Sequence, residues 1–380
     1  MAACTISTSV MARWLTASVM WHWMLPCSDP AIVAIARIAR GGGPGGNVAV
    51  AGGETRPVIA LEESIVMNNV SIIALSLAAS LVLAAGAQDL PKNAPTQEQL
   101  ANDNKLFISL ANRALKWEEP AEPIKIVGPL YFVGTKGLGV FLFTTSEGHI
   151  LMNTGMPSSG PMIVESIRRL GFKPEDIKIM INGHAHIDHA GAFASLKERF
   201  GATLAVMKDD VPAMESGDRD DFKYANDFLY PPVKVDRILR DGDTIKMGDV
   251  LLTAYHTPGH TRGATTWIAN LVVDGKAYVV AFPDGAGFNP GYRLAKNPSY
   301  PGIVDDYRHT HHMLEMLKPD IWLAQHNEYY DLEGKRQRAQ TEGVQAWIDP
   351  EGYRRFVAGK KRAFEDEVDE EMGAPTKAEK

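Results

Sequence analysis

Short runs of apolar residues, separated by polar and turn-forming residues, predict a chain of strands after residue 88. One helix is predicted before them, at residues 97–116, where apolar residues recur at helical spacing. Segments bounded by glycine and proline then predict strands at residues 124–127, 130–134, 139–144, 149–152, 177–181 and 203–207. Two helices are predicted between them, at residues 162–170 and 191–200.

The second half of the chain repeats this arrangement. Strands are predicted at residues 244–245, 250–255, 265–268, 277–282 and 321–324, with a helix at residues 303–317 before the last of them. Bunched strands with helices between them are typical of a layered α/β domain, and the repetition suggests two related halves. We expect this domain to span residues 88–358, followed by a charged tail at residues 359–380 that begins as helix and ends as coil.

The first 87 residues fit neither pattern. Residues 1–66 show no sustained period, whereas residues 70–87 form an apolar run that ends in Ala85-Gly86-Ala87. Such a run is typical of a secretory signal peptide, although the short segment before it, Met67–Asn69, contains no Lys or Arg. We therefore expect translation to begin at Met67, a signal peptide at residues 67–87, and a periplasmic or secreted protein without stable membrane insertion. The alternative is a single membrane anchor, since roughly 17 residues can suffice to span a bilayer.

Composition restricts the possible chemistry. Charged residues make up 22% of the 380 residues and the formal net charge is −7, which argues against nucleic acid as a partner. The two cysteines, Cys4 and Cys27, both lie in the front segment. The predicted domain therefore has no disulfide and no thiolate nucleophile, and any zinc in it must have nitrogen and oxygen ligands.

The densest group of potential ligands directly follows the predicted strand at residues 177–181. It reads His184-Ala-His186-Ile-Asp188-His189. On an extended segment residues two apart point the same way, so His184 and His186 can bind one metal ion. Asp188 and His189, displaced by a turn, can reach a neighbouring ion. Four such groups without a metal would leave several buried polar atoms unpaired.

Two later elements supply further histidines. His256-Thr-Pro-Gly-His260 follows a strand, and its Pro-Gly turn can direct His260 inward, whereas we interpret His256 as structural. His326 follows the last predicted strand. It is a candidate ligand because the second ion still lacks a third one. Of the other histidines, we interpret His309, His311 and His312 as solvated or packing residues, whereas His149 starts a predicted strand and His22 lies in the front segment.

At these motifs the sequence resembles the metallo-β-lactamase superfamily. HAHIDH matches its HxHxDH motif, HTPGH its second histidine element and His326 its final histidine. From Trp117 to Asp331 the chain resembles class B, subclass 3 β-lactamases, in stretches such as GHILMNTGMP and NPSYPGIVDDYR. The resemblance implies an αββα four-layer sandwich with the site at one edge of the two sheets. It also implies two Zn²⁺ ions, the first bound by His184, His186 and His260, the second by Asp188, His189 and His326.

Three positions depart from the family pattern. Gly183 stands where Thr or Ser is usual, and Asn153 replaces an aspartate, which would weaken a hydrogen bond behind a ligand. Asp284 stands about where the subclass has a serine. Related hydrolases place a metal-bridging aspartate there, so Asp284 is either an extra ligand or an aspartate of the turn before Gly285.

The resemblance implies hydrolysis of a β-lactam antibiotic, a small-molecule substrate. A metal-bound hydroxide would attack the ring carbonyl, and Asp188 would orient it. Serines such as Ser158, Ser159 and Ser299 would take no part in the chemistry, and the loops at residues 156–160 and 284–292 would form the pocket walls. A lactonase or a thioester hydrolase on the same two metals is the alternative enzyme, and a zinc-binding protein without catalysis is the alternative from another class.

Overall fold

The computed structural model describes residues 104–224 and 227–373. The expected extension at residues 1–66, the expected signal peptide at residues 67–87 and the first part of the predicted helix at 97–116 lie outside these residues. Within them, no helix combines the length and apolar character that a membrane crossing requires.

The first of two sheets has seven strands in sequential order, β1 to β7. They are β1 (Ile124–Val127), β2 (Leu130–Phe132), β3 (Phe141–Thr145), β4 (Gly148–Met152), β5 (Ile177–Ile181), β6 (Thr203–Met207) and β7 (Arg237–Leu239). Strands β1 to β4 are antiparallel hairpins, and β4 to β7 run parallel to one another. The change to parallel pairing at β5 brings its carboxyl end beside that of β4.

The second sheet has five strands in the order β12-β11-β10-β9-β8. They are β8 (Thr244–Met247), β9 (Val250–His256), β10 (Thr265–Val273), β11 (Lys276–Phe282) and β12 (Ile321–Trp322). Because β10 is antiparallel to both β9 and β11, and β12 is parallel to β11, strands β9, β11 and β12 end at the same edge.

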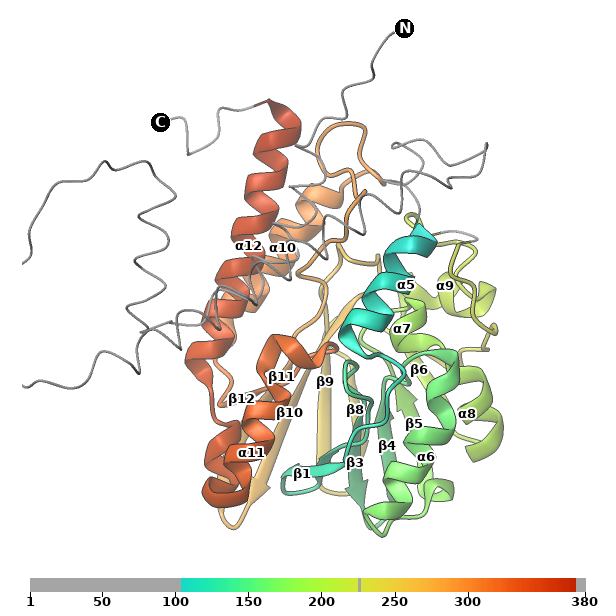
Figure 1. The fold of residues 1–380 in the computed structure, drawn as a ribbon, viewed down its shortest axis with the longest axis vertical. Coiled ribbons are helices and arrows are strands. Elements are labelled where there is room, and N and C mark those ends of the chain that lie inside the picture. The colour runs from blue at the N-terminus through green and yellow to red at the C-terminus, as the bar shows by residue number, and fades with distance from the viewer. Residues whose placement is uncertain (1–103, 225–226, 374–380) are drawn as a thin grey trace, which may run out of the picture. The chain divides into compact units, whose positions relative to one another are not determined.

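Helices cover the outer faces of the two sheets (Figure 1), which confirms the predicted αββα sandwich. Helices α6 (Gly160–Arg169) and α8 (Phe193–Phe200) pack on the first sheet, and α10 (Ile303–Met316) and α12 (Pro350–Met372) lie side by side against the second. The remaining helices are α5 (Asn104–Leu115), α7 (Ile187–Ala190), α9 (Val211–Ser216) and α11 (Leu332–Glu342).

Strand alternation explains the four layers. On β3, Phe141 and Phe143 point between the sheets and contact Phe282 of β11, with ring centroids 5.0 and 5.8 Å apart. Leu142, between them in sequence, belongs instead to the cluster formed with α6 and α8. Both faces of the strand are therefore buried, and each large apolar side chain contributes about 1.5–3 kcal/mol by leaving water.

The expected boundary between residues 358 and 359 is wrong, because it falls inside α12. Tyr353, Val357, Lys360 and Phe364 are all buried, and their spacing of four, three and four residues continues one helical face across the boundary. Near the end of α12, Glu371 accepts hydrogen bonds from three consecutive backbone N–H groups at residues 294–296, at 2.7–2.8 Å. The sequence analysis predicted helix at the start of the tail, but the many charged residues on the opposite face hid its continuity with the domain.

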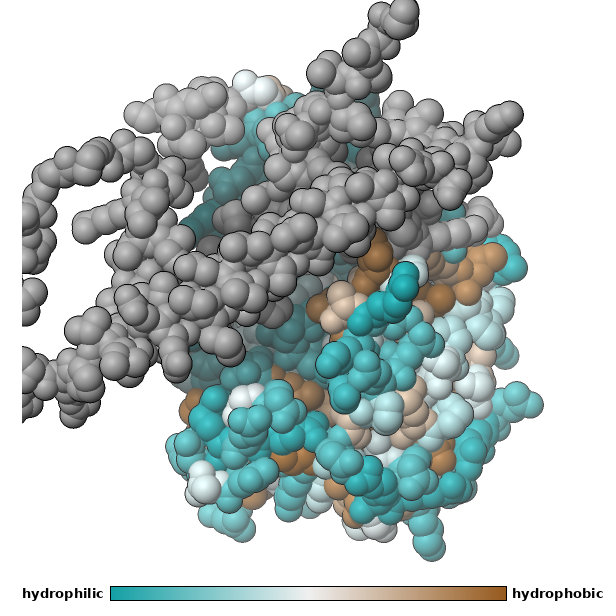
Figure 2. All heavy atoms as spheres, in the orientation of Figure 1, coloured by the Kyte–Doolittle hydropathy of each residue, from teal (hydrophilic) through white to brown (hydrophobic). Residues whose placement is uncertain are grey.

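The exposed surface gives no single apolar face. In Figure 2 hydrophobic residues of the described part appear in patches between hydrophilic ones. The most exposed large apolar side chains lie on four different elements: Val272 on β10, Met372 on α12, Met316 on α10 and Ile238 on β7. Scattered apolar residues of this kind are normal for a folded domain.

The edge where β5, β9, β11 and β12 end is joined across the two sheets. The Thr265 N–H of β10 donates to the carbonyl of Gly183, beyond β5, at 2.7 Å, and Trp267 donates to the carbonyl of Asn182 at 2.8 Å. A β-bridge also links Leu138 with His326. The loops that carry the candidate ligands are therefore fixed to one another through their backbones.

Candidate metal centre

The HAHIDH residues occupy the turn from β5 into α7. His184 and His186 lie on the segment before the helix, with His186 at its N-cap in extended conformation, and Asp188 and His189 lie on α7 itself. This is the displacement expected from the sequence. Backbone N–H groups at residues 189 and 190 donate to the His186 carbonyl, which fixes the turn.

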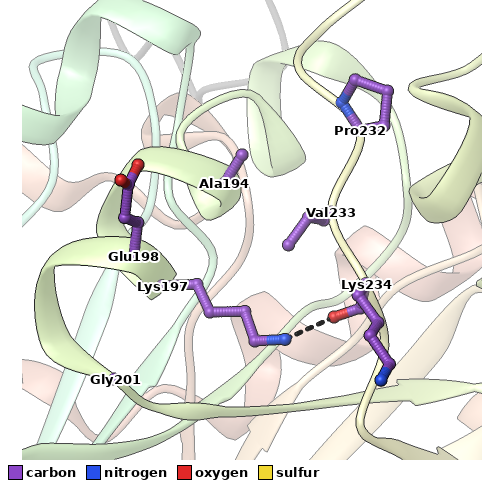
Figure 3. A pocket seen from close by; sticks show the side chains of 7 residues that line it. All are labelled: Ala194, Lys197, Glu198, Gly201, Pro232, Val233 and Lys234. Carbon is purple, nitrogen blue, oxygen red and sulfur yellow. Dashed lines mark hydrogen bonds between the residues drawn. The ribbon is translucent and has the colours of Figure 1, made fainter.

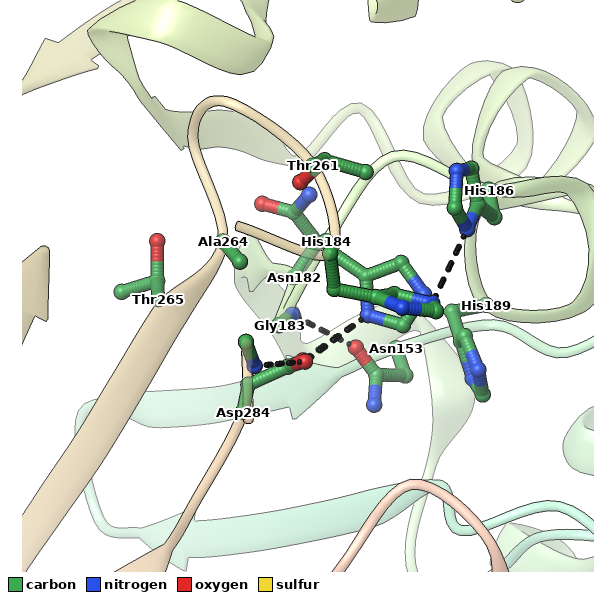
Figure 4. Close-up of polar contacts among 12 residues, drawn as sticks. Asn153, Asn182, Gly183, His184, His186, His189, Thr261, Ala264, Thr265 and Asp284 are labelled. Carbon is green, nitrogen blue, oxygen red and sulfur yellow. Dashed lines mark hydrogen bonds and ion pairs between the residues drawn. The ribbon is translucent and has the colours of Figure 1, made fainter. Parts of the chain in front are cut away.

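One group of ligand atoms joins His184, His186 and His260, and we call it the three-histidine site. Its ligand nitrogens lie within 4.8 Å of one another. His186 Nδ1 and His260 Nε2 are 3.2 Å apart, close to the roughly 3.3 Å that separates two nitrogens on a tetrahedral zinc ion with bonds of 2.0–2.1 Å. Figure 4 shows His184 and His186 in this arrangement.

Each imidazole of the three-histidine site has an outer partner. Asp284 lies 2.9 and 3.1 Å from His184 Nδ1, and the Gly287 carbonyl lies 2.9 Å from His260 Nδ1. Asp221 Oδ1 lies 3.4 Å from His186 Nε2. A carbonyl only accepts, so His260 Nδ1 carries the proton and its Nε2 presents a lone pair to the site. Partners of this kind orient metal-binding histidines.

The charges agree with this geometry. Burial, helped by neighbouring histidines, holds the pKa of His184 and His260 well below the usual value, so both are neutral. Burial also opposes protonation of His186, yet Asp221 outweighs it and raises the His186 pKa to about 9. In the metal-free protein a proton on His186 Nδ1 therefore bridges to His260 Nε2, at the position where a cation would bind.

The second group contains Asp188, His189 and His326, and we call it the aspartate site. His189 Nε2 and His326 Nε2 lie 3.2 and 3.5 Å from Asp188 Oδ2. Ligand atoms of Asp188 and His189 also lie within 4.8 Å of His184, so the two sites adjoin. Burial raises the pKa of Asp188, but the histidines around it prevail and hold that pKa well below the usual value.

These residues fit divalent metal ions. His184 Nε2 and His189 Nε2, which face the site, are buried and have no hydrogen-bond partner among the described residues. Such orphaned atoms are rare unless a ligand satisfies them. Imidazole nitrogens with one carboxylate, and no thiolate, form a donor set that suits zinc.

Asp284 is placed behind a ligand. The groups of ligand atoms that lie close enough to share an ion, among the described residues, do not include Asp284, and its carboxylate faces His184 Nδ1 (Figure 4). Asn153 Oδ1 accepts the Gly183 N–H at 2.8 Å, so this amide performs the holding role of the usual aspartate on the loop backbone. The sequence predicted that Asn153 weakens a hydrogen bond to a metal ligand. The hydrogen bonds that Asn153 makes do not involve a ligand.

The other histidines are placed as the sequence suggested. His256 Nε2 lies 2.7 Å from the Arg262 carbonyl and closes the loop that presents His260. His311 is buried against Tyr307 and Phe364, whereas His309 and His312 are exposed.

Two aspartates of the site were missed by the sequence analysis. Asp221 is positioned by its own loop, since its Oδ2 accepts the N–H groups of Lys223 and Tyr224 at 2.5 and 2.6 Å. Asp210 accepts hydrogen bonds from Thr261 Oγ1 at 2.8 Å and the Gly263 N–H at 2.7 Å, which holds the loop around His260. Asp221 follows no strand and no motif, so only its position beside an aromatic-rich loop could have pointed to it.

Aromatic residues surround the two sites. Trp117 lies 5.4 Å from the His326 ring and Tyr224 lies 5.0 Å, edge-on, from the His186 ring. Met156 packs in the same cluster as both. The Tyr224 hydroxyl accepts a hydrogen bond from Asn289 at 2.8 Å, so residues from both expected wall loops do reach this region.

A separate cavity of about 510 Å³ lies between α8 and residues 232–234 (Figure 3). None of the candidate ligands lines it. One of its two lysines, Lys197, donates to the Lys234 carbonyl at 2.6 Å and pairs with Asp236 at 2.7 Å. The cavity therefore has no chemistry comparable to that of the ligand cluster.

Comparison with known proteins is consistent across sequence and structure. The model of the metallo-β-lactamase superfamily matches residues 140–267. Native FEZ-1 metallo-β-lactamase from Legionella gormanii is 39% identical with a TM-score of 0.65, covering 67% of this chain and 98% of its own. The class B3 di-zinc enzyme LRA-12 from an Alaskan soil metagenome is 32% identical with a TM-score of 0.64, covering 66% and 96%.

Curated relatives match over shorter stretches. An N-acyl homoserine lactonase from Bacillus sp is 27% identical over 143 residues, 32% of this chain and 54% of the relative. The acyl-coenzyme A thioesterase MBLAC2 from Gallus gallus is 33% identical over 98 residues, 21% and 33% of the two chains. The chain thus spans about half the length of the lactonase and a third of the thioesterase. With the ligand clusters and the near-complete structural matches together, the chain belongs to the metallo-β-lactamase superfamily and takes its place beside the class B3 enzymes.

Proposed function

We propose that the protein is a zinc-dependent hydrolase that opens the β-lactam ring of antibiotics at a two-metal site. The observation that carries this proposal is the convergence of two adjoining three-residue ligand groups from the loops after β5, β9 and β12. Closed structural zinc sites have four protein ligands, whereas three leave a position for water or substrate. Matches to class B3 β-lactamases that cover 96–98% of those chains support the substrate class.

The residues of the chain divide the work. Zinc bound here would lower the pKa of water from ~15.7 towards ~7 and polarise a carbonyl. The three-histidine site would hold one ion in a fixed geometry, because each imidazole has its outer acceptor. Asp188, between the two groups, would orient the attacking water through its carboxylate. Trp117 and Tyr224 would provide apolar surface for the substrate beside the ligands.

Lactone or thioester hydrolysis is the second candidate, and the Bacillus lactonase and the MBLAC2 thioesterase favour it. The sequence argument for it depended on Asp284 as a bridging ligand. Asp284 lies 2.9 Å from His184 Nδ1, which favours the role of an outer partner over that of a bridging ligand. The shorter coverage of these relatives also makes them weaker guides to substrate than the class B3 enzymes.

A hydrolysis screen tests the proposal. The purified protein is assayed with nitrocefin, an acyl homoserine lactone and an acyl-coenzyme A thioester, with added zinc and with chelator. We expect zinc-dependent nitrocefin turnover that exceeds the other two activities. Turnover of the lactone or thioester alone would instead support lactone or thioester hydrolysis. Zinc binding without any turnover would favour a zinc-binding protein without catalysis.

Two further features belong to this proposal. We expect two zinc ions per chain at saturation, measured by mass spectrometry of the native protein. We also propose a periplasmic or secreted location, which fits an enzyme whose substrates arrive from outside the cell, and which N-terminal sequencing of exported protein tests. A first residue near Gln88 is the expected result.

A further inference from the structure

The first step concerns the absence of a side chain at Gly183. A Cβ atom placed there would lie 2.2 Å from Asp284 Oδ2 and 2.9 Å from Gln325 Nε2. Its backbone is not in the left-handed region, so the conformation itself does not require glycine. What requires glycine here is space, and the space is occupied by the Asp284 carboxylate.

The second step concerns how firmly Asp284 is held. Its Oδ1 accepts the Gly285 N–H at 2.6 Å, and its backbone N–H donates to Thr266 Oγ1 at 3.0 Å. Both carboxylate oxygens lie within 3.1 Å of His184 Nδ1. Asp284 is also buried, with 6% of its surface exposed. A buried carboxylate in this geometry accepts the Nδ1 proton and leaves Nε2 as the metal-binding atom.

We propose that Gly183 and Asp284 act as one unit: the missing side chain admits the carboxylate, and the carboxylate fixes His184 for metal binding. Asp284 is then a positioning residue that acts through His184, and the residues at positions 183 and 284 are coupled through the space that they share. This inference rests on the proposed two-metal site, and it concerns how that site is held rather than which substrate it takes.

A double-mutant cycle tests the linkage. The variants are Gly183→Ser, Asp284→Ser and the two combined, and the readouts are the zinc Kd by chelator competition and the zinc content at saturation. We expect Asp284→Ser to weaken zinc binding ~10–100-fold, as loss of an outer partner typically does. Gly183→Ser should cost at least as much, because its added atoms displace Asp284. The combined variant should lose at least tenfold less affinity than the product of the two single effects.

Controls separate this result from damage to the fold. Gly359→Ser adds the same atoms at an exposed glycine with no neighbour within 4 Å, and its zinc affinity should be unchanged. Asp284→Asn keeps the shape and a carbonyl acceptor for Nδ1, and should recover part of the loss. Circular dichroism of each metal-free variant confirms that it is folded.

Three outcomes would overturn the proposal. If the fold-losses of zinc affinity in the two single variants simply multiply in the combined variant, the two positions are independent. Loss of one zinc equivalent at saturating metal in Asp284→Ser would make Asp284 a ligand. A wild-type protein that binds no zinc would remove both this inference and the proposed function. If the wild type binds zinc but hydrolyses no β-lactam, the function fails alone, because the zinc readouts still decide the linkage.

Discussion

The two ligand groups differ in how their imidazoles are held from behind. In the three-histidine site every outer ring nitrogen faces an acceptor: Asp284 and the Gly287 carbonyl at 2.9 Å, and Asp221 at the longer distance of 3.4 Å. In the aspartate site the outer nitrogens of His189 and His326 have no hydrogen-bond partner among the described residues. The three-histidine site is therefore the better preorganised of the two. We expect the first zinc to bind more tightly than the second.

The largest expected effect comes from removing one ligand of each group. His186→Ala should lose the tightly bound zinc, and its turnover should fall by well over the ~100-fold typical of an outer partner. His326→Ala should lose only the weaker zinc and keep one equivalent. Mass spectrometry under native conditions measures both.

His312→Ala, on the exposed face of α10, is the control and should keep both ions. If His326→Ala released the tighter ion, the order of the two sites would be reversed. Full zinc content in His186→Ala would contradict the ligand assignment itself.

The next effect comes from Asp221→Asn, which removes one outer acceptor without touching a ligand. Above pH 9, where His186 is mostly neutral, zinc binding at the three-histidine site should weaken ~10–100-fold. Titration with a competing chelator measures it. Asp220→Asn, an exposed neighbour, should change little. An unchanged affinity in Asp221→Asn would mean that the His186 ring is held by packing alone.

The pH dependence is a third way to sharpen the comparison. Because the His186 pKa is about 9 in the metal-free protein, zinc must displace one proton at pH 7, and affinity should rise by about tenfold per unit up to pH 9. Asp221→Asn should flatten this slope. For the metal-free protein the sign follows from the raised pKa: stability from protonated His186 is full below pH 6.5 and is lost as the pH rises through 9.

Calorimetry in buffers of different ionisation enthalpy measures the proton released on zinc binding. Uptake of zinc at pH 7 without proton release would show that His186 is already neutral, and would remove the bridging proton from the description of the site.

The smallest expected effect concerns the aspartate site alone. Lys360, buried on α12, lies with its ammonium 4.2 Å from the Tyr329 ring centre, and its charge helps burial and His189 lower the His326 pKa to about 3. Lys360→Met should therefore tighten the second zinc by roughly threefold to tenfold through weaker repulsion. Lys361→Met, whose amine pairs with Glu315 at 2.9 Å, is the control. Equal changes in zinc affinity at both sites would show that Lys360 does not act on the aspartate site alone.

The sequence could predict those site residues that lie next to local structural signals. Strand ends followed by His184 to His189, by His260 and by His326 could be located because β-strand patterns and turn residues are local signals. Asp221 could not, because it reaches His186 from a loop without periodicity. The pairing of Gly183 with Asp284 could not either: the positions are 101 residues apart, and only the space between them shows that they are related. The end of the domain was misplaced because surface charge on α12 masks its buried face.

Glu371 has a consequence for how the protein is made. It holds the backbone at residues 294–296 from a distance of 75–77 residues along the chain. During synthesis these three backbone N–H groups lack their acceptor until residue 371 has left the ribosome, after every histidine of the chain has been made. A truncation that removes Glu371 would therefore act on this loop before it acts on the sheets.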